Sequence, residues 1–321
     1  MSEMRFALGI VLALASGVAA AQAYPSRPVR VLIPFTAGSA ADIIARAMEP
    51  AMREKLGQPW VIDNRGGAGG NIAAEITAKS TADGYTIMMA TVGTHAINHS
   101  LYRKLAFHPV RDFTPVALVG ESPNALVLNP KVPANSIKEL IALAKSKPGA
   151  LNYGSSGAGT TVHLSAELFS TMAGIKMVHV PFKGAAESLT ALIAGQTDLQ
   201  FASLSSAIPL IRSGRLKAFA VTGAQRSPSL PELPTVAELE LPGYEAAAWF
   251  GVVAPAGAPR PVVSTLSKAV LAVLAEKEVR DRLFASGVEV RPLGPEAFAK
   301  LIESEMTKWA QVVKASGARA D

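Results

Sequence analysis

Short apolar runs alternate with amphipathic stretches along the first part of the chain. The apolar runs cover residues 29–35, 60–63 and 85–90, and the amphipathic stretches cover residues 40–56 and 71–79. Apolar runs of this length are typical of buried strands, and apolar positions three or four residues apart are typical of helices. The order strand–helix–strand–helix–strand predicts a parallel sheet with right-handed crossovers.

The same alternation continues through the middle of the chain. It predicts strands at 125–128, 151–153, 177–181, 199–202 and 218–222, and helices at 136–145, 160–172, 187–194 and 207–212. Ser136 is followed three residues later by Glu139, which predicts a capping box at the start of its helix.

The last part of the chain begins with a proline-rich segment, 227–242, that cannot hold a long helix. A strand at 248–254 and helices at 261–275, 277–286 and 295–314 are predicted after it. We therefore predict two α/β lobes, with the C-terminal helices packed on the first. Lobe I comprises residues 24–122 and 246–321, and lobe II comprises residues 123–245.

Residues 1–23 have the features of a cleavable export signal. Arg5 precedes an apolar run at 6–15, and small residues follow up to Ala21-Gln22-Ala23. This pattern predicts cleavage after Ala23 and a periplasmic mature protein that begins at Tyr24. An uncleaved membrane anchor is the alternative, but the apolar segment is short for a bilayer span.

Composition narrows the function further. The chain has no cysteine, which excludes a disulfide framework and thiol chemistry. Apolar residues make up 49% of the chain, so each lobe can bury a core. The net charge is +6, but Lys and Arg are scattered singly and aromatic residues are few, so we predict no nucleic-acid partner.

Three loops rich in small residues each follow a predicted strand and precede a predicted helix. They are residues 34–42, 64–71 and 153–163. Ligands of open α/β sheets bind at the carboxyl ends of the strands, where these loops lie. Glycines let backbone N–H groups approach a ligand, and a helix N-terminus adds a partial positive charge. Tight turns alone would explain one such loop, but three loops over two lobes predict an anion site.

The motifs of nucleotide binding are absent. No phosphate-cradling G-x-x-x-x-G-K-[ST] occurs, and G-x-G-x-x-G fails because Ile72 and Val162 stand at its last position. We therefore expect no cofactor, and a carboxylate is the simplest anionic ligand.

Two chemical alternatives, a serine hydrolase and a metal site, match the sequence only in part. Ser156 resembles the serine of a hydrolase elbow, but Ala158 replaces the last glycine, and His163 is the histidine that can serve Ser155 or Ser156 as a base. His95 and His99 have helical i, i+4 spacing but lack the glutamate of the zinc-protease motif and a third ligand. We therefore expect neither catalysis nor a metal, and place the two histidines at the surface or an interface.

At these loops the sequence resembles the tripartite tricarboxylate transporter solute-receptor family, the Bug proteins, over essentially the whole mature chain. The motifs that carry the resemblance are Val31-Leu32-Ile33-Pro34-Phe35 with Gly38, Asp42, Ala45 and Arg46; Asn64-Arg65 with Gly67-Ala68-Gly69-Gly70-Asn71-Ile72; Asp83-Gly84-Tyr85-Thr86; Tyr153-Gly154-Ser155-Ser156-Gly157 with His163-Leu164; and Val180-Pro181-Phe182-Lys183-Gly184.

The resemblance implies a Venus-flytrap fold with a ligand cleft between the lobes. It also implies a periplasmic receptor that delivers a carboxylic acid to a membrane permease, typically of two further subunits. A sensor that signals through a membrane partner, such as a sensor kinase, uses the same closed state and stays open as an alternative. We expect the receptor to be a monomer.

Carried over residue by residue, the resemblance implies that two loops and two further residues contact the ligand. These residues are Phe35, Thr36, Ala37, Gly38, Ser39 and Asp42 in lobe I, Ser155, Ser156, Gly157, Gly159, Thr160 and Thr161 in lobe II, and the weaker candidates Lys183 and Asp198.

Three positions depart from the family pattern. Ser39 stands where a second glycine is common, Ala41 where Thr or Ser is common, and Ala73 where glycine is usual. Ser39 adds a Cβ and a hydroxyl at the mouth of the site, so the family's ligands do not transfer directly. Asp42 suits the start of its helix as a cap as well as it suits ligand contact.

The residues that select one acid over another are not placed by the sequence. Candidates for the pocket wall are aromatic, and each of them suits a core position equally: Phe35, Phe182, Phe201, Trp249 and Phe250. An aromatic, di- or tricarboxylic acid fits these residues.

Overall fold

A computed structural model describes residues 24–182 and 184–320. The predicted export signal and the candidate Lys183 lie outside these residues.

Apart from most of β4 and all of β10, the strands follow the predicted apolar runs closely. They are Val29–Ile33 (β1), Trp60–Asn64 (β2), Thr86–Thr91 (β3), Phe113–Leu128 (β4), Asn152–Ser155 (β5), Val178–Pro181 (β6), Leu199–Ser203 (β7), Lys217–Val221 (β8), Ala247–Pro255 (β9) and Glu289–Leu293 (β10).

The helices cover the predicted amphipathic stretches. They are Ala40–Leu56 (α2), Ala68–Gly70 (η1), Asn71–Ala78 (α3), Gly93–Ile97 (η2, a π-helical turn), Asn98–Leu101 (α4), Ile137–Ser146 (α5), Thr161–Ala173 (α6), Ala185–Ala194 (α7), Leu204–Arg212 (α8), Val236–Leu239 (α9), Arg260–Ala275 (α10), Lys277–Ala285 (α11) and Pro295–Ser316 (α12). Helix α2 has the predicted bounds, because Ser39 caps its start and Gly57 ends it in a left-handed conformation.

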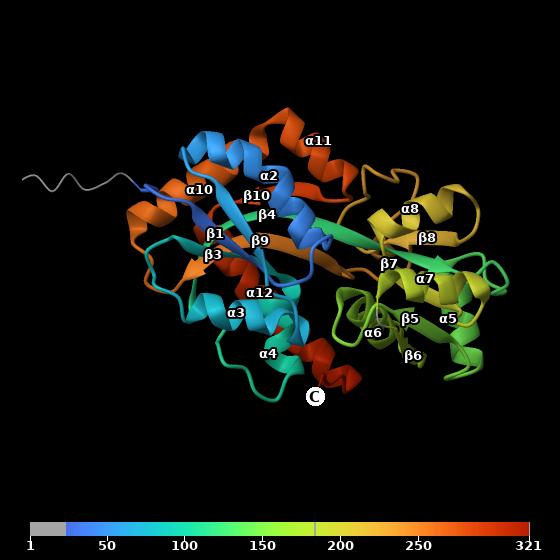
Figure 1. The fold of residues 1–321 in the computed structure, drawn as a ribbon. Helices are drawn as coiled ribbons and strands as arrows, with labels where there is room; N and C mark the ends of the chain where they lie inside the picture. The colour runs from blue at the N-terminus through green and yellow to red at the C-terminus, as the bar shows by residue number, and fades with distance from the viewer. Residues whose placement is uncertain (1–23, 183, 321) are drawn as a thin grey trace, which may run out of the picture.

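The sheet has two parallel parts joined by two long antiparallel strands, in the order β2-β1-β3-β9-β4-β7-β5-β6 (Figure 1). Strand β1 is parallel to β2 and β3, and β5 is parallel to β6 and β7, as the strand–helix alternation predicts. Strand β4 pairs with β9 up to Pro123 and with β7 from Asn124 onward. This change of partner supports the proposed division into two lobes near residues 122 and 246.

The sequence prediction missed most of β4. Only 125–128 was predicted as strand, whereas the strand begins at Phe113. Pro115 and Pro123 break the usual strand pattern, and the ladder to β9 is irregular near Pro115 and Gly120. Irregular pairing of this kind accommodates residues that a regular strand excludes.

The predicted capping box at Ser136 forms only in part. The Ser136 hydroxyl accepts the Glu139 N–H, but the Glu139 carboxylate accepts the N–H of Asn135, not that of Ser136. A complete box is found at the start of α9, between Thr235 and Glu238.

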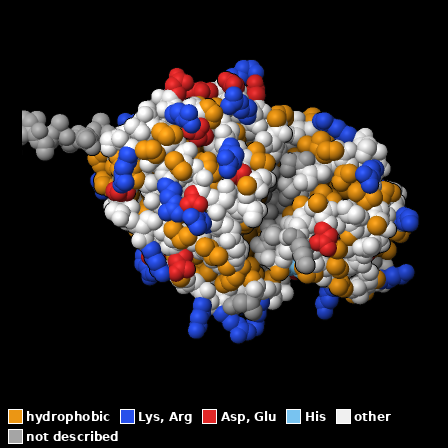
Figure 2. Space-filling model, in the orientation of Figure 1, with side chains coloured by type: hydrophobic (Ala, Val, Ile, Leu, Met, Phe, Trp, Pro, Cys, Tyr) orange, Lys and Arg blue, Asp and Glu red, His pale blue; other side chains and the backbone are white. Residues whose placement is uncertain are grey.

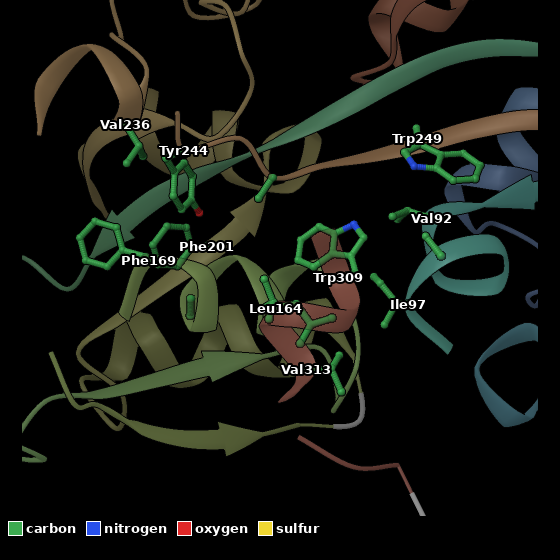
Figure 3. Close-up of a cluster of buried hydrophobic side chains, with 14 of the residues drawn as sticks. Val92, Ile97, Leu164, Phe169, Phe201, Val236, Tyr244, Trp249, Trp309 and Val313 are labelled. Carbon is green, nitrogen blue, oxygen red and sulfur yellow. The ribbon is translucent and has the colours of Figure 1, made fainter. Parts of the chain in front are cut away.

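The hydrophobic core crosses from one lobe to the other along α12 (Figure 3). The fully buried Trp309 of α12 and its neighbour Val313 belong to the same buried cluster as Leu164 of α6 and Ile97 of η2. Helices α10 and α11 pack against α2 as predicted, whereas α12 contacts both η2 and the lobe II helix α6. Helix α12 therefore packs on lobe I as predicted, and its additional contact with lobe II was not predicted.

Between residues 24 and 320, Lys183 apart, no helix combines the length and hydropathy that a bilayer span requires.

Candidate functional site

The lobe I loop after β1 is exposed and leads directly into α2. Thr36, Ala37 and Gly38 are exposed, and Phe35 and Ser39 are half-buried. Ser39 caps the helix by accepting the Asp42 N–H through its hydroxyl (3.4 Å). In the described part of the chain, the amides of Thr36 and Ala37 have no hydrogen-bond partner, so they can donate to a ligand.

Asp42 supports this loop from within. It is 3% exposed, and its carboxylate accepts the Gly38 N–H (2.9 Å) and the Arg46 Nε–H (3.0 Å). Burial opposes its ionisation, but the hydrogen bonds from Arg46 and Gly38 outweigh burial and lower the pKa of the carboxyl. The geometry thus gives Asp42 the capping role and engages the Gly38 amide.

The second small-residue loop backs the first. Asn64 Nδ2 donates to the Phe35 carbonyl (3.0 Å), and a Cβ on Gly66 would lie 3.3 Å from the Thr36 nitrogen. The second loop therefore shapes the back of the first loop.

The lobe II loop between β5 and α6 is held by internal hydrogen bonds. The Ser155 hydroxyl is fully buried and lies 3.1 Å from both the N and the O of Gly157. The Gly159 N–H donates to His163 Nδ1 (3.0 Å), and the Thr160 hydroxyl donates to the Gly157 carbonyl (2.8 Å). Ser155, Gly157 and Gly159 thus hold the loop together.

The residues between these contacts carry the donors that this loop leaves free. Ser156 and Thr161 are half-buried and Ala158 is exposed. Within the described residues, the amides of Ser156 and Ala158 and the hydroxyls of Ser156 and Thr161 have no hydrogen-bond partner. Ala158 was not among the predicted site residues, because its side chain carries no polar group and only its amide can act.

Two stacked histidines lie behind this loop. His163 of α6 and His179 of β6 have ring centroids 3.9 Å apart, and His179 Nε2 lies 2.7 Å from the Ser155 hydroxyl. Burial, and secondarily the neighbouring His163, lower the pKa of His179 to about 4. His179 was missed from the sequence, where it is a lone histidine within an apolar strand.

A buried acid completes the cluster. Tyr153 donates its hydroxyl to Glu167, and Glu167 lies 3.7 Å from His163 Nε2. Burial opposes the ionisation of Glu167, but hydrogen bonds from His163 and Tyr153 lower its pKa. Burial and the Glu167 bond raise the pKa of Tyr153. The i, i+4 spacing of His163 and Glu167 was the sequence signal for this pair.

The structure separates some predicted residues from the loops. Asp198 precedes β7, and its carboxylate accepts the N–H of Asn152 at the start of β5 (2.8 Å). Because both residues lie where parallel strands begin, Asp198 stands at the opposite sheet edge from the ligand loops. Its placement near the cleft was therefore wrong.

The five aromatic candidates for the pocket wall differ in burial. Phe201, Trp249 and Phe250 are at most 5% exposed and belong to the core. Phe35 and Phe182 are half-buried and flank the two loops. A Cβ on Gly157 would lie 3.7 Å from the Phe182 carbonyl. Of the five aromatic candidates, Phe35 and Phe182 are therefore the two that are not buried in the core, although Phe35 packs partly against the lobe I core.

His95 and His99 differ from the expectation that both lie at a surface. His99 is exposed, but His95 is fully buried against the edge of Phe113, with its Nδ1 2.9 Å from the Thr94 hydroxyl. Burial lowers the pKa of His95 to about 3. Over the described ranges, no three His, Cys, Asp or Glu side chains form a metal-binding group.

The lobes meet next to the lobe II loop. A Cβ on Gly159 would lie 2.1 Å from Leu101 Cδ2 of α4, so the two lobes are in van der Waals contact there. Figure 2 shows the surface hollowed between the two halves of the molecule, with Lys and Arg scattered singly over the visible face.

Known proteins share this sequence and architecture. Residues 44–318 match the family described as "Tripartite tricarboxylate transporter family receptor". Protein BugT of Bordetella pertussis is 34% identical over 323 residues, covering 99% of both chains.

Solved structures of similar proteins have the same fold. Rpa4515 of R. palustris, solved with adipate, has a TM-score of 0.81 and 40% identity, covering 92% of this chain and 99% of its own. MatC of Rhodopseudomonas palustris, with bound malate, has a TM-score of 0.77 and 36% identity, covering 90% and 100%. The periplasmic binding protein BugD has a TM-score of 0.78 and 34% identity, covering 93% and 100%. The chain therefore belongs to the tripartite tricarboxylate transporter family of receptors, and its two-lobed α/β architecture is that of periplasmic binding proteins.

Proposed function

We propose that this receptor captures a small dicarboxylate between its lobes and presents the closed form to a membrane permease. The observation that carries the proposal is the set of unpartnered amides on the two loops, Thr36 and Ala37 in lobe I and Ser156 and Ala158 in lobe II. Two donor sets on opposite lobes suit a ligand with a carboxylate at each end.

The dipoles of two helices can stabilise the negative charge of the ligand. Helices α2 and α6 begin directly after the two loops and direct their positive ends toward them. The nearby Arg46 and Arg65 are paired with Asp42 and Asp63. A carboxylate held by N–H groups and hydroxyls needs no fixed cation, and each charge-assisted bond contributes about 1.5–3 kcal/mol.

The relatives solved with ligand support a dicarboxylate. Both adipate and malate carry two carboxylates, and the proteins that hold them are 40% and 36% identical to this chain. Phe35 and Phe182 give the space between the loops apolar edges, which suits the methylene chain of a longer diacid. Tricarboxylates and aromatic acids are the next classes to test.

A serine hydrolase is disfavoured by the geometry. Ser155 is the serine beside a histidine, but its hydroxyl is fully buried and bonded within the loop. His163, the histidine first considered as a base, accepts the Gly159 N–H. We propose that the chain is a binding protein, exported with cleavage after Ala23 and active as a monomer.

Calorimetry on the mature protein with adipate, malate, citrate and butyrate tests this function. A diacid at 100 times its dissociation constant stabilises the fold by about 2.7 kcal/mol, which a thermal shift detects. Ala37→Val places two methyl groups at the lobe I amides and should abolish binding. The matched control is Ala150→Val, at an exposed turn before β5, at the opposite edge of the lobe II sheet. Binding of butyrate as tight as that of the diacids would contradict the two-ended site.

A further inference from the structure

We propose that His163 and His179 are positioning residues for the ligand, because as a stacked pair they hold the lobe II loop in its binding shape. This inference rests on the proposed function for its ligand, but the anchoring itself is a property of the ligand-free protein.

His163 holds the far end of the loop. Its Nδ1 accepts the Gly159 N–H at 3.0 Å, so this nitrogen carries no proton, and the neutral ring has its proton on Nε2. Nε2 faces the Glu167 carboxylate at 3.7 Å. A second proton on His163 would occupy Nδ1 and remove the acceptor from Gly159.

His179 holds the near end of the loop through Ser155. The Ser155 hydroxyl lies 2.7 Å from His179 Nε2 and 3.1 Å from the N and O of Gly157. All three contacts are satisfied together when His179 Nε2–H and Gly157 N–H donate to the hydroxyl and the hydroxyl donates to the Gly157 carbonyl. One buried hydroxyl thus holds both backbone polar groups of Gly157, which belong to the two peptide units on either side of its Cα.

The stack ties the two anchors to each other. The rings are 3.9 Å apart at 12°, and Tyr153 stacks on His179 from the other side at 5.0 Å. A proton on the His179 ring places a cation against the His163 ring in a partly buried site, and burial disfavours that cation. Because the two rings pack on each other, replacing either ring also removes packing from the other anchor.

The stacked rings of His163 and His179 are surrounded by residues of β5 and α6, and α12 packs on α6. Tyr153 of β5 and Glu167 of α6 are the titratable groups that face the rings. Helix α12 contacts α6, where the apolar Trp309 and Val313 share a cluster with Leu164. In the described ranges, the polar contacts of the two rings are made to Ser155, Gly159 and Glu167.

The ligand-facing groups lie between the two anchors. The amides of Ser156 and Ala158 alternate with the anchored amides of Gly157 and Gly159. When the anchored peptides turn, the free ones turn with them, because neighbouring peptides share a Cα. The affinity for the lobe II carboxylate therefore follows the state of two side chains that need not touch the ligand.

The experiment compares substitutions that keep or remove each anchor. His163→Asn keeps an acceptor near the Nδ1 position and His179→Gln keeps a polar group near the Nε2 position, and neither side chain titrates. His163→Leu and His179→Leu remove the anchors. The matched control is His99→Leu, which makes the same substitution at an exposed histidine outside the stacked pair. Adipate affinity is measured by calorimetry, and the Gly157 and Gly159 amides are followed by NMR hydrogen exchange without ligand.

We expect each leucine variant to weaken adipate about tenfold, the equivalent of about 1.4 kcal/mol, while the Asn and Gln variants stay within about threefold of the wild type. In the ligand-free protein, exchange of Gly159 should accelerate with His163→Leu and exchange of Gly157 with His179→Leu. Folded leucine variants with wild-type affinity and exchange would overturn the proposal.

If the wild type binds no carboxylate, the proposed function fails, and the exchange rates still decide the anchoring.

Discussion

The carboxylate of Asp42 shows how a single buried residue shapes a surface loop. It is 3% exposed and is held by Arg46 and by the Gly38 N–H. Replacement by Ala leaves that amide without its acceptor and leaves the guanidinium with only its 3.4 Å hydrogen bond to Asn64 Oδ1. We expect Asp42→Ala to lower the free energy of unfolding by about 1–3 kcal/mol and to weaken ligand binding, measured by urea unfolding and calorimetry. Unchanged affinity would show that the loop keeps its shape without the carboxylate.

The pH dependence of this contribution has a definite sign. The folded state lowers the pKa of Asp42 below its usual value of 3.8, so the unfolded chain binds the proton more readily. The stabilisation is therefore present above about pH 4 and is lost as the pH falls through the folded-state pKa. The difference in unfolding free energy between the wild type and Asp42→Asn should narrow from pH 7 to pH 3. A constant difference would mean that the carboxylate acts through shape alone.

At the scale of elements, both ligand loops end in a capped helix. Ser39 accepts the Asp42 N–H at the start of α2, and Thr160 accepts the His163 N–H at the start of α6. Ser39→Ala should lower stability by about 1 kcal/mol, whereas Ser39→Gly should cost only a few tenths, since glycine is a tolerated cap. Thermal unfolding of the two variants measures this.

The variants Ser39→Ala and Ser39→Gly also test which acids the site accepts. Both remove the hydroxyl, but only Ser39→Gly also removes a Cβ from the mouth of the site. A gain in affinity for a bulkier acid in Ser39→Gly, and not in Ser39→Ala, would identify the Cβ as the restricting group, whereas a gain in both variants would identify the hydroxyl. Equal affinities for all three proteins would confine Ser39 to its capping role.

Elements with strong local signals were predictable, and those fixed by long-range pairing were not. The start and end of α2 follow from Ser39 and Gly57. Strand β4 was mostly missed, because Pro115 and Pro123 break the usual strand pattern, and Pro115 lies at an irregularity in the pairing with β9. In the site, the loops were predictable from their glycines, whereas His179 meets Ser155 through the pairing of β5 with β6, which the sequence does not display. The same limit led to the wrong placement of Asp198.

At the scale of the whole molecule, a partly buried acidic site lies where β4 pairs with β10. Glu121 pairs with Arg291, while Glu289 Oε1 is buried without a partner, and the three residues line a cavity of about 380 Å³. Burial raises the pKa of Glu289, and nearby Glu121 adds to the effect. Because this pKa is raised on folding, the carboxyl favours the folded state at low pH and loses that advantage as the pH rises through the folded-state pKa. Glu289→Gln should therefore raise the melting temperature by about 1–2 °C at pH 8 and less at pH 4.5. A lower melting temperature at pH 8 would show that the ionised group has a partner.

The contact between the lobes at Gly159 links the fold to ligand capture. Gly159 has φ +76°, and a Cβ there would meet Leu101 Cδ2 at 2.1 Å, closer than two carbons approach without movement. Gly149 has a matching φ of +78° with nothing within 4 Å, so it provides the control for backbone strain alone. Gly159→Ala and Gly149→Ala should each cost about 1 kcal/mol of stability from the left-handed backbone.

Only Gly159→Ala should also separate the lobes. We expect it to weaken ligand binding at least tenfold and to enlarge the radius of gyration with ligand present, measured by calorimetry and small-angle X-ray scattering. Gly149→Ala should bind as the wild type does. Adding Leu101→Ala to Gly159→Ala removes the obstructing side chain and should restore most of the affinity. If the double variant binds as poorly as Gly159→Ala, the loss lies in the loop backbone, and the approach of the lobes is not limited at this contact.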